Sequence, residues 1–357
     1  MVRSPVKKTR LASCARFLAW VYAGALVAVA LLLRFVGEGW WLLTAVMYVP
    51  RVLFALPLVI AVPAIVWAGP RWMLVTQVAA GLLVLFPLMG LQLHPMTQKP
   101  EPGAPTIRVM SFNVFFGHSG CDTVVDEVAA HDPDVVVLQA WSRSCDGALA
   151  ARLPSLHVEV DGEFLLATRY PVRDVYHPPR LEGPPSVVSA FMRYTLETPL
   201  GSIDVYSIHP YSPRVGFQAA RTDVHTHVLA ADDDTRPPKG RAEIEQNTST
   251  RTRQVTAVAD AAMRSTNPVI IAGDTNLPAL SAVYARTLAA GPWQDGFATV
   301  GNGLGYTFPT RWRYDLGPWM RIDRILAGPA LRFLRFEVGG RGASDHCPVI
   351  AELGWRT

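Results

Sequence analysis

The chain has 357 residues, of which 50% are hydrophobic and 17% charged, and its formal net charge at pH 7 is +4. This length exceeds one domain of average size, and the net charge is too small to indicate nucleic-acid binding by itself. The composition is also uneven, because the part before about residue 95 is very apolar and almost free of acidic residues.

Three apolar runs make up most of this first part: Phe17 to Leu33, Trp40 to Trp67 and Trp72 to Leu93. Each is long enough to cross a hydrocarbon core of about 30 Å, so we predict three transmembrane helices at about residues 12–33, 40–67 and 72–93. A cleaved signal peptide would explain only the first run. Pro50 and Arg51 interrupt the second run, and they leave open a re-entrant piece followed by a helix, which would make the number of crossings even.

The distribution of basic residues predicts the orientation in the membrane. Four basic residues lie within the first ten positions, and Arg71 lies between the second and third runs. Positively charged segments remain cytoplasmic, so three crossings place the residues after Leu93 outside the cytoplasm. We therefore predict an integral plasma-membrane protein whose globular part is extracytoplasmic.

Two further segments follow the apolar runs. Residues 94–106 contain four prolines and are predicted to form a stiff, extended linker. Residues 107–357 suffice for one large globular domain. A location outside the cytoplasm permits a disulfide, and Cys121 with Cys145 is the candidate pair, although cysteine spacing does not fix connectivity.

Several predicted strands of this domain end in polar residues. The segment from Pro268 to Ala272 is typical of a strand buried on both faces, and Asp274 and Asn276 follow it at positions that point to one side. Taken alone, these two residues are equally consistent with a turn. Further strands are predicted at 106–114, 133–140, 164–171, 187–196, 201–208, 320–326 and from 349, and helices at 122–131 and 250–265. The polar residues at strand ends are Asn113, His209, Asp274, Asn276, Asp323, Asp345 and His346.

These fragments, in this order, resemble the endonuclease/exonuclease/phosphatase superfamily, which includes DNase I-like nucleases, sphingomyelinases and inositol polyphosphate phosphatases. The resemblance covers nearly all of residues 106–357. The matching pieces are Ser111-Phe112-Asn113, Leu138-Gln139, Thr168-Arg169-Tyr170-Pro171, the strand ending at His209, Gly273-Asp274-Thr275-Asn276, Ile322-Asp323 and Ser344-Asp345-His346. The resemblance implies an α/β fold, the four-layered α/β/β/α sandwich, and hydrolysis of phosphate esters with Mg²⁺ or Mn²⁺.

The resemblance also implies a division of catalytic roles. Asp274 would orient or deprotonate the attacking water, and Asn276 would hold a phosphate oxygen. His346, paired with Asp323, would stabilise the transition state or protonate the leaving oxygen, and His209 would contact the phosphate from the other side. This division is chemically sensible, because phosphoryl transfer depends mainly on positioning and charge neutralisation.

The metal and substrate positions include one departure from the family pattern. By the resemblance Asn113 and Asp345 lie at the metal, and Arg169 is a substrate-binding residue or, equally, a structural donor that ties loops together. Where the family has a metal-binding glutamate, this chain has Ala140, and losing an anionic ligand weakens Mg²⁺ binding. Three explanations stay open: Asn113, Asp345 and another acid such as Glu163 hold the ion through waters, the domain keeps only phosphate binding, or the alanine is an introduced knockout.

We therefore predict a membrane-anchored, metal-dependent phosphoesterase that acts on a phosphodiester. A lipid or other small phosphodiester suits a membrane tether, nucleic acid remains a possible substrate, and the sequence indicates no protein partner. The alternative, suggested by Ala140, is a catalytically impaired protein that binds phosphate or lipid headgroups.

Overall fold

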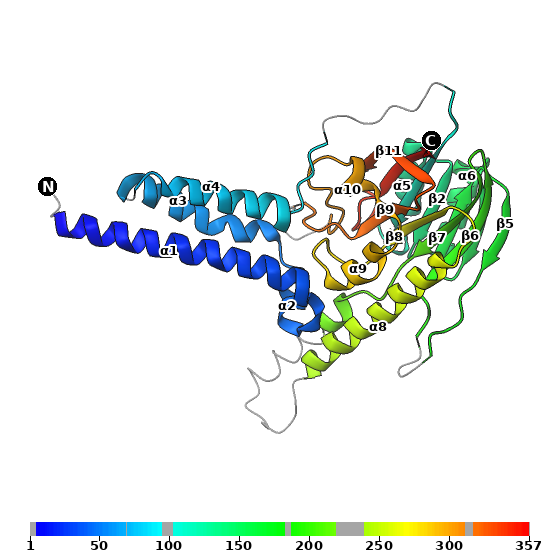
Figure 1. Cartoon of the computed structure of the whole chain (residues 1–357). Coiled ribbons are helices and arrows are strands. Elements are labelled where there is room, and N and C mark those ends of the chain that lie inside the picture. The colour runs from blue at the N-terminus through cyan, green and yellow to red at the C-terminus, as the bar shows by residue number, and fades with distance from the viewer. Residues whose placement is uncertain are drawn as a thin grey trace. The chain divides into compact units, whose positions relative to one another are not determined.

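The computed structural model describes residues 5–68, 70–94, 103–182, 187–218, 239–310 and 317–356 (Figure 1). It divides into two compact units. One takes in the residues up to Leu91 together with Leu280–Ala282, and the other takes in Gln92–Ala279 and the residues from Val283 onward. Most of the predicted linker, residues 95–102, lies outside the described residues.

The first unit is helical. Its elements in chain order are α1 (Pro5–Leu31), the π-helical turn η1 (Leu32–Val36), the 3-10 turn η2 (Gly37–Gly39), α2 (Trp41–Met47), η3 (Arg51–Ala55), α3 (Leu56–Ala68), α4 (Met73–Leu83) and the π-helical turn η4 (Val84–Leu88). The apolar runs of the sequence therefore do form helices, but these helices are interrupted.

The prediction of three membrane-spanning helices is wrong. Within residues 5–68 and 70–94, only Arg16–Gly39 is long and apolar enough to cross a membrane as one helix, and a signal sequence would pass the same test. The second run passes only if α2 and the helix after it count as one span bent by 92°, and the third run forms a shorter helix. The second run breaks at Pro50, because proline lacks an amide hydrogen and disfavours helical geometry in the residue before it. The third run ends at Gly90, whose φ of +76° is not helical.

Arg51, which follows the break, is buried within this unit. Its Nη1 donates a hydrogen bond of 2.8 Å to the carbonyl oxygen of Leu88, at the end of η4. The carbonyl end of a helix carries partial negative charge, so this contact compensates part of the cost of burying a guanidinium in an apolar helical unit.

The second unit contains two mixed β-sheets of six strands. Their strand orders are β11-β12-β1-β2-β4-β3 and β5-β6-β7-β8-β10-β9. The pairs β1/β2 and β7/β8 are parallel, and the other pairs are antiparallel. The strands are β1 (Thr106–Asn113), β2 (Val135–Gln139), β3 (His157–Asp161), β4 (Phe164–Thr168), β5 (Val172–Tyr176), β6 (Phe191–Thr198), β7 (Gly201–Ile208), β8 (Val269–Asp274), β9 (Gln294–Asp295), β10 (Asp323–Ala327), β11 (Leu331–Val338) and β12 (Val349–Trp355).

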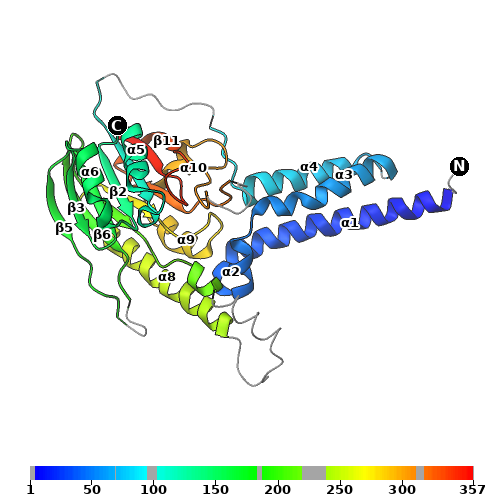
Figure 2. The ribbon, with the colours of Figure 1, turned by 180° about the vertical axis from the view of Figure 1, so that it is seen from behind.

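Helices cover the outer face of each sheet, as Figures 1 and 2 show from opposite sides. The helices α5 (Cys121–His131) and α6 (Asp146–Arg152) pack on the first sheet, and α8 (Lys239–Met263) packs on the second. A third apolar cluster fills the space between the sheets. The predicted mixed α/β sandwich with two sheets is therefore confirmed. Short helical elements complete the unit: η5 (Phe115–Gly117), η6 (Arg143–Cys145), α9 (Ala282–Arg286), η7 (Leu288–Ala290) and α10 (Gly296–Val300).

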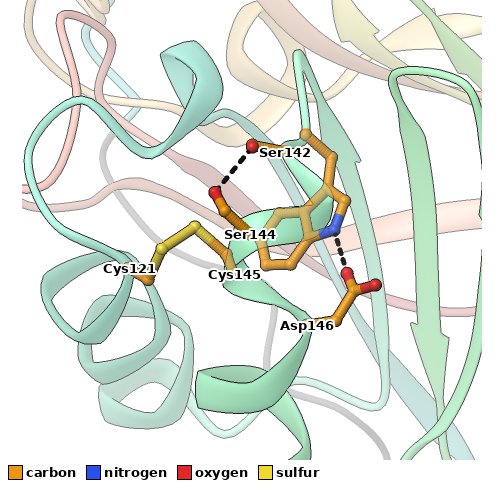
Figure 3. Close-up of a disulfide and its surroundings, with 6 residues drawn as sticks. Cys121, Ser142, Ser144, Cys145 and Asp146 are labelled. Atoms are coloured by element: carbon orange, nitrogen blue, oxygen red, sulfur yellow. Dashed lines mark hydrogen bonds between the residues drawn. A yellow bond between two sulfur atoms is a disulfide. The ribbon is translucent and has the colours of Figure 1, made fainter.

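The predicted disulfide between Cys121 and Cys145 is present, with a Cα–Cα distance of 5.1 Å (Figure 3). It joins the first residue of α5 to the last residue of η6. A Cβ atom on Gly117, whose φ is +71°, would lie 2.6 Å from Sγ of Cys145. Glycine is therefore required where the loop after β1 rests on the disulfide.

Candidate functional site

The apolar core between the sheets becomes polar at one end, following the alternation of side chains along each strand. On β8, Ile270 and Ala272 belong to the inter-sheet core, and Asp274 is the next residue on the same face. The same spacing places Asn113 on the face of Val109, His209 on the face of Val205, and Asp323 on the face of Ile325. The inward faces of four strands therefore deliver polar groups to one region.

Strand pairing brings these groups together. Asp323 begins β10 and is the antiparallel partner of Asp274, which ends β8. On the other side of β8, Gly273 pairs with Ile208, the residue before His209. A Cβ atom on Gly273 would lie 2.0 Å from the carbonyl oxygen of Ile208, so only glycine permits this close approach.

Asp274 lies at the centre of the group and is buried. Its Oδ1 accepts a hydrogen bond from the backbone N–H of Asn276 (2.8 Å), and its Oδ2 accepts one from Nδ2 of Asn113 (3.0 Å). Nε2 of His346 and Nε2 of His209 lie 3.6 and 3.8 Å from the same Oδ2. Three nitrogen atoms thus converge on one carboxylate oxygen, which is the arrangement needed to bind an anion.

Each histidine is oriented by its own carboxylate. Nδ1 of His346 lies 2.9 and 3.1 Å from the two carboxylate oxygens of the buried Asp323. Nδ1 of His209 lies 3.1 Å from Oε2 of Glu163, which is about one third exposed. With Nδ1 held by a carboxylate, Nε2 of each ring is directed at Asp274.

These contacts shift the pKa values of all three central groups. Burial alone would lower the pKa of His346, but the carboxylates of Asp323, Asp274 and Asp345 outweigh it and raise the pKa to about 9. Burial also acts to lower the pKa of His209, and Glu163 and Asp274 raise it above its usual value. Burial, reinforced by Asp323, raises the pKa of Asp274, although the two imidazoles partly offset this. These contacts thus favour the imidazolium form of His346 at neutral pH.

Asp345 lies beside this group. Its Oδ1 is 4.0 Å from Nε2 of His346 and 3.4 Å from Oγ of Ser344, and its Oδ2 accepts a hydrogen bond of 3.0 Å from Nη2 of Arg214. Oγ of Ser344 also donates to the backbone oxygen of Asn113, which ties the loop before β12 to the end of β1. The ring of Phe308 covers His346 with a centroid distance of 4.6 Å.

The side chain of Asn276 contacts the loop after β7. Its Nδ2 donates to the carbonyl oxygen of Pro210 at 2.9 Å, and its φ is +51°. Asparagine tolerates this left-handed conformation better than most residues. The bond connects the loop after β8 to the loop after β7.

The structure does not bring Arg169 to this group. Arg169 directly follows Thr168, the last residue of β4, which pairs with the first residue of β2. Asn113 pairs with the last residue of β2, at the opposite end of that strand. These two points are about 13 Å apart along an extended strand. The guanidinium of Arg169 pairs with Asp132 and Asp134 instead. In this position the guanidinium contacts carboxylates just before β2 rather than the group around Asp274.

Two residues near the site were not predicted in the positions they occupy. The sequence suggests Glu163 only as an additional metal ligand, whereas in the structure its carboxylate contacts Nδ1 of His209. This contact forms because β4 runs antiparallel to β2, so that the start of β4 lies beside the end of β2. Arg214 carries no motif and lies in the segment after β7. Its contact with Asp345 depends on loop geometry, for which the sequence gives no signal.

The side chains present fit a divalent metal ion only in part. Among the described residues, Asp274, Asp323 and His346 each offer a ligand atom within 4.8 Å of the others, so this group could hold a metal ion. However, the oxygens of Asp274 and Asp323 accept the hydrogen bonds given above. Ala140 is buried and offers no carboxylate. An ion at this site would have to share carboxylate oxygens that already accept hydrogen bonds from the chain.

Comparison with known proteins places this arrangement in a family. Residues 110–346, more than half of the chain, match the endonuclease/exonuclease/phosphatase family. A comparison with curated proteins finds no match. Similar solved structures are a family protein from Bacteroides thetaiotaomicron (15% identity, 71% of this chain and 99% of that one, TM-score 0.51) and a 3'-5' exonuclease from Neisseria meningitidis (18%, 70% and 100%, 0.50). At these identities the structures support the fold alone. The extent of the sequence match nevertheless shows that this chain belongs to the endonuclease/exonuclease/phosphatase family.

Proposed function

We propose that the chain is a membrane-anchored phosphoesterase that hydrolyses a phosphodiester. The observation that carries this proposal is the convergence of the side chains of Asn113, His209 and His346 on the buried carboxylate of Asp274. The same nitrogen atoms that now face Oδ2 of Asp274 could hold the oxygens of a phosphate group. A protein that needed only a stable core would gain little from burying this many charges.

Each central residue has one chemical task in the proposed reaction. The oxygen of a water molecule forms a bond to phosphorus while Asp274 takes the proton of that water. The bond from phosphorus to the leaving oxygen breaks, and this oxygen takes the proton from Nε2 of His346. Asp323 keeps His346 protonated near neutral pH, and His209, held by Glu163, neutralises a phosphate oxygen.

Asn276 and Asn113 would complete the phosphate site. The backbone N–H of Asn276 fixes the carboxylate of Asp274, and we assign its side chain to a phosphate oxygen, as the resemblance implies. The amide of Asn113 lies between the two imidazoles. We assign no substrate contact to Arg169.

The cofactor expected from the sequence is Mg²⁺ or Mn²⁺, because family enzymes commonly use divalent ions. The donors available for it besides the Asp/Asp/His group are Asn113, Asp345 and Glu163. Two of them already bind donors of the chain: Oδ1 of Asn113 accepts from the backbone N–H of Phe115, and Oδ2 of Asp345 accepts from Nη2 of Arg214, so an ion would compete with these donors. No step of the proposed reaction is therefore assigned to a metal.

We further propose that the helical segment Arg16–Gly39 is a membrane anchor, and that residues 107–357, joined through a linker at residues 94–106, lie on the outer side of the plasma membrane. The basic residues within the first ten positions favour a cytoplasmic N-terminus, and one crossing by Arg16–Gly39 then places the domain outside. The disulfide between Cys121 and Cys145 supports an oxidising compartment. Alkaline phosphatase and fluorescent protein fusions after residue 100 would test this, and fluorescence without phosphatase activity would contradict it.

The catalytic proposal is tested on purified full-length protein in detergent with bis(4-nitrophenyl) phosphate. Replacing a catalytic acid or base commonly lowers rates about 10²- to 10⁴-fold, so we expect losses of this size in Asp274→Asn and His346→Gln. The matched control is Arg169→Ala, which removes a charged side chain at the far end of the sheet and should leave kcat within about twofold of the parent. Equal rates in Asp274→Asn and the parent would refute the assignment. An oligonucleotide and phosphatidylcholine vesicles then distinguish nucleic acid from lipid as substrate.

A second function is favoured by one observation, the alanine at position 140. A chain that kept the phosphate site and lost turnover would bind lipid headgroups or other phosphates without hydrolysing them. Absence of turnover in the parent and in Ala140→Glu, combined with measurable binding of inorganic phosphate, would support this second function.

A further inference from the structure

Arg214 holds a place in the site that no motif predicts. Its Nη2 donates to Oδ2 of Asp345 at 3.0 Å, and its guanidinium carbon lies 5.5 Å from the centre of the Phe115 ring. The side chain of Asp345 is 10% exposed, whereas that of Arg214 is 47% exposed. The guanidinium therefore lies between the buried carboxylate and the solvent from which a substrate arrives.

The carboxylates and amide around this point already have donors from the chain. Both oxygens of Asp274 accept hydrogen bonds, Oδ1 of Asn113 accepts from a backbone N–H, and Oδ2 of Asp345 accepts from Arg214. Among the residues that the structure describes, no buried side-chain atom without a hydrogen-bond partner belongs to this group. Mg²⁺ needs about six oxygen ligands, several of them usually waters and carboxylates, and Ala140 supplies none.

A guanidinium can provide part of what a divalent ion provides. It keeps its positive charge at any pH at which the protein is folded, and it has five N–H donors in a fixed plane. The bond to Asp345 uses one donor, which leaves others for a phosphate oxygen. The contact with the Phe115 ring restricts the orientation of the Arg214 guanidinium. Preorganised donors of this kind stabilise the charge that develops on phosphate oxygens.

We propose that Arg214 is the resident cation of this site: it neutralises Asp345 and binds a phosphate oxygen, so that hydrolysis proceeds without a divalent metal ion. This inference rests on the proposed function. Arg214 exchanges no proton. The water proton still goes to Asp274 and the leaving oxygen is still protonated by His346, so the reaction balances as given above.

The test uses full-length protein in detergent, treated with EDTA, and bis(4-nitrophenyl) phosphate as the probe. We expect the parent to be active in EDTA and to change less than about twofold when Mg²⁺ or Mn²⁺ is added in excess. Removing one oxyanion donor costs about 10²- to 10³-fold in kcat in other enzymes, and we expect a loss of this size in Arg214→Ala. Arg214→Lys keeps the positive charge but lacks the planar guanidinium, so its kcat should lie between those of the parent and Arg214→Ala. The matched control is Arg152→Ala, which breaks the exposed ion pair between Arg152 on α6 and Asp126 on α5.

Two binding measurements do not depend on turnover. Calorimetry with inorganic phosphate in EDTA should show binding to the parent that is at least about tenfold weaker in Arg214→Ala. Electron paramagnetic resonance of free Mn²⁺ should show no uptake by the parent and uptake by the double variant Ala140→Glu/Arg214→Ala. Thermal unfolding of each variant establishes that it is folded.

The outcomes separate this inference from the proposed function. A parent that is inactive in EDTA and active with Mg²⁺ or Mn²⁺ overturns the role of Arg214 and leaves the phosphoesterase intact. Equal phosphate binding by the parent and Arg214→Ala also overturns it. A folded parent with no turnover under any condition overturns the proposed function, and the phosphate titration alone then decides whether Arg214 binds the anion.

Discussion

Replacing Asp323 by asparagine should change how the stability of the protein depends on pH. Asp323 is buried against His346, whose pKa is raised to about 9. A group whose pKa is raised in the folded state stabilises the protein fully below its unfolded value of 6.5, and this contribution is lost as the pH rises through about 9. Since one pKa unit corresponds to about 1.4 kcal/mol, the whole rise is equivalent to roughly 3 kcal/mol.

Asp323 is the largest of the carboxylate contributions that overcome the effect of burial, so we expect its removal to abolish most of this energy, about 2 kcal/mol. For a domain of this size 1 kcal/mol shifts the unfolding midpoint by about 2 to 4 °C. We therefore expect the midpoint of Asp323→Asn to lie further below that of the parent at pH 6 than at pH 9.5, with the gap changing by roughly 4 to 8 °C.

The assay is thermal unfolding of the full-length protein in detergent, followed by tryptophan fluorescence across this pH range. Asp161→Asn is a suitable control, because it removes the carboxylate of an exposed pair with His177 at 2.6 Å. Exposed pairs contribute about 1 kcal/mol or less, so its curve should follow that of the parent. A constant gap between Asp323→Asn and the parent from pH 6 to 9.5 would show that this carboxylate does not control the protonation of His346.

Three other variants, two single and one double, have definite expected outcomes. Asp295→Asn removes a buried carboxylate whose pKa is lowered to about 2, because two arginines outweigh the effect of burial. This stabilisation is present above pH 3.8 and is lost as the pH falls through 2. At pH 7 we therefore expect the free energy of unfolding, measured by denaturation, to fall by roughly 3 to 5 kcal/mol, against less than about 1 kcal/mol for the exposed control Asp174→Asn. Gly273→Ala should abolish folded expression, measured by size-exclusion chromatography, since its methyl group would collide with a backbone oxygen; a monodisperse, active variant would contradict this. Replacing both Cys121 and Cys145 by serine should destabilise the protein by about 2 to 5 kcal/mol in thermal or denaturant unfolding, and an unchanged midpoint would show that the crosslink is dispensable.

The sequence allowed the buried strands and their polar ends to be predicted because both depend on local patterns. The apolar segment that became β8 and the polar residue Asp274 after it are visible as a run and its end. The four strands at the sheet edges, β3, β5, β9 and β11, were missed. The residues of β3 and β5 are mostly partly buried or exposed and lack a clean apolar alternation, β9 has only two residues, and an irregularity between Phe333 and Arg335 interrupts the alternation in β11. Hydropathy likewise indicated three long apolar runs. Pro50 marked a possible break in the second run, where the structure has one, but no pattern showed that the helix of the third run is too short to span a membrane.

The site was harder to predict wherever it depends on strand direction or loop contacts. Glu163 and Arg169 flank the same strand, and only the direction of β4 decides which of them lies near Asp274. The sequence contains no signal for that direction, so the two roles considered for Arg169 stayed open and the contact of Glu163 with His209 was not predicted. Arg214 reaches Asp345 across 131 positions of the chain, a contact that no local pattern encodes.

Because side chains alternate along β1, β7, β8 and β10, the chemistry of this protein depends on the exact number of residues in each of these strands. One inserted or deleted residue within any of these strands would rotate its last side chain to the helix-covered face and replace it with a neighbour. In β8 either change would turn Asp274 toward α8; a deletion would present Thr275 to the imidazoles, and an insertion would present Gly273. Length changes in this family should therefore accumulate in loops, whereas the four strands tolerate exchanges of residue but not of number.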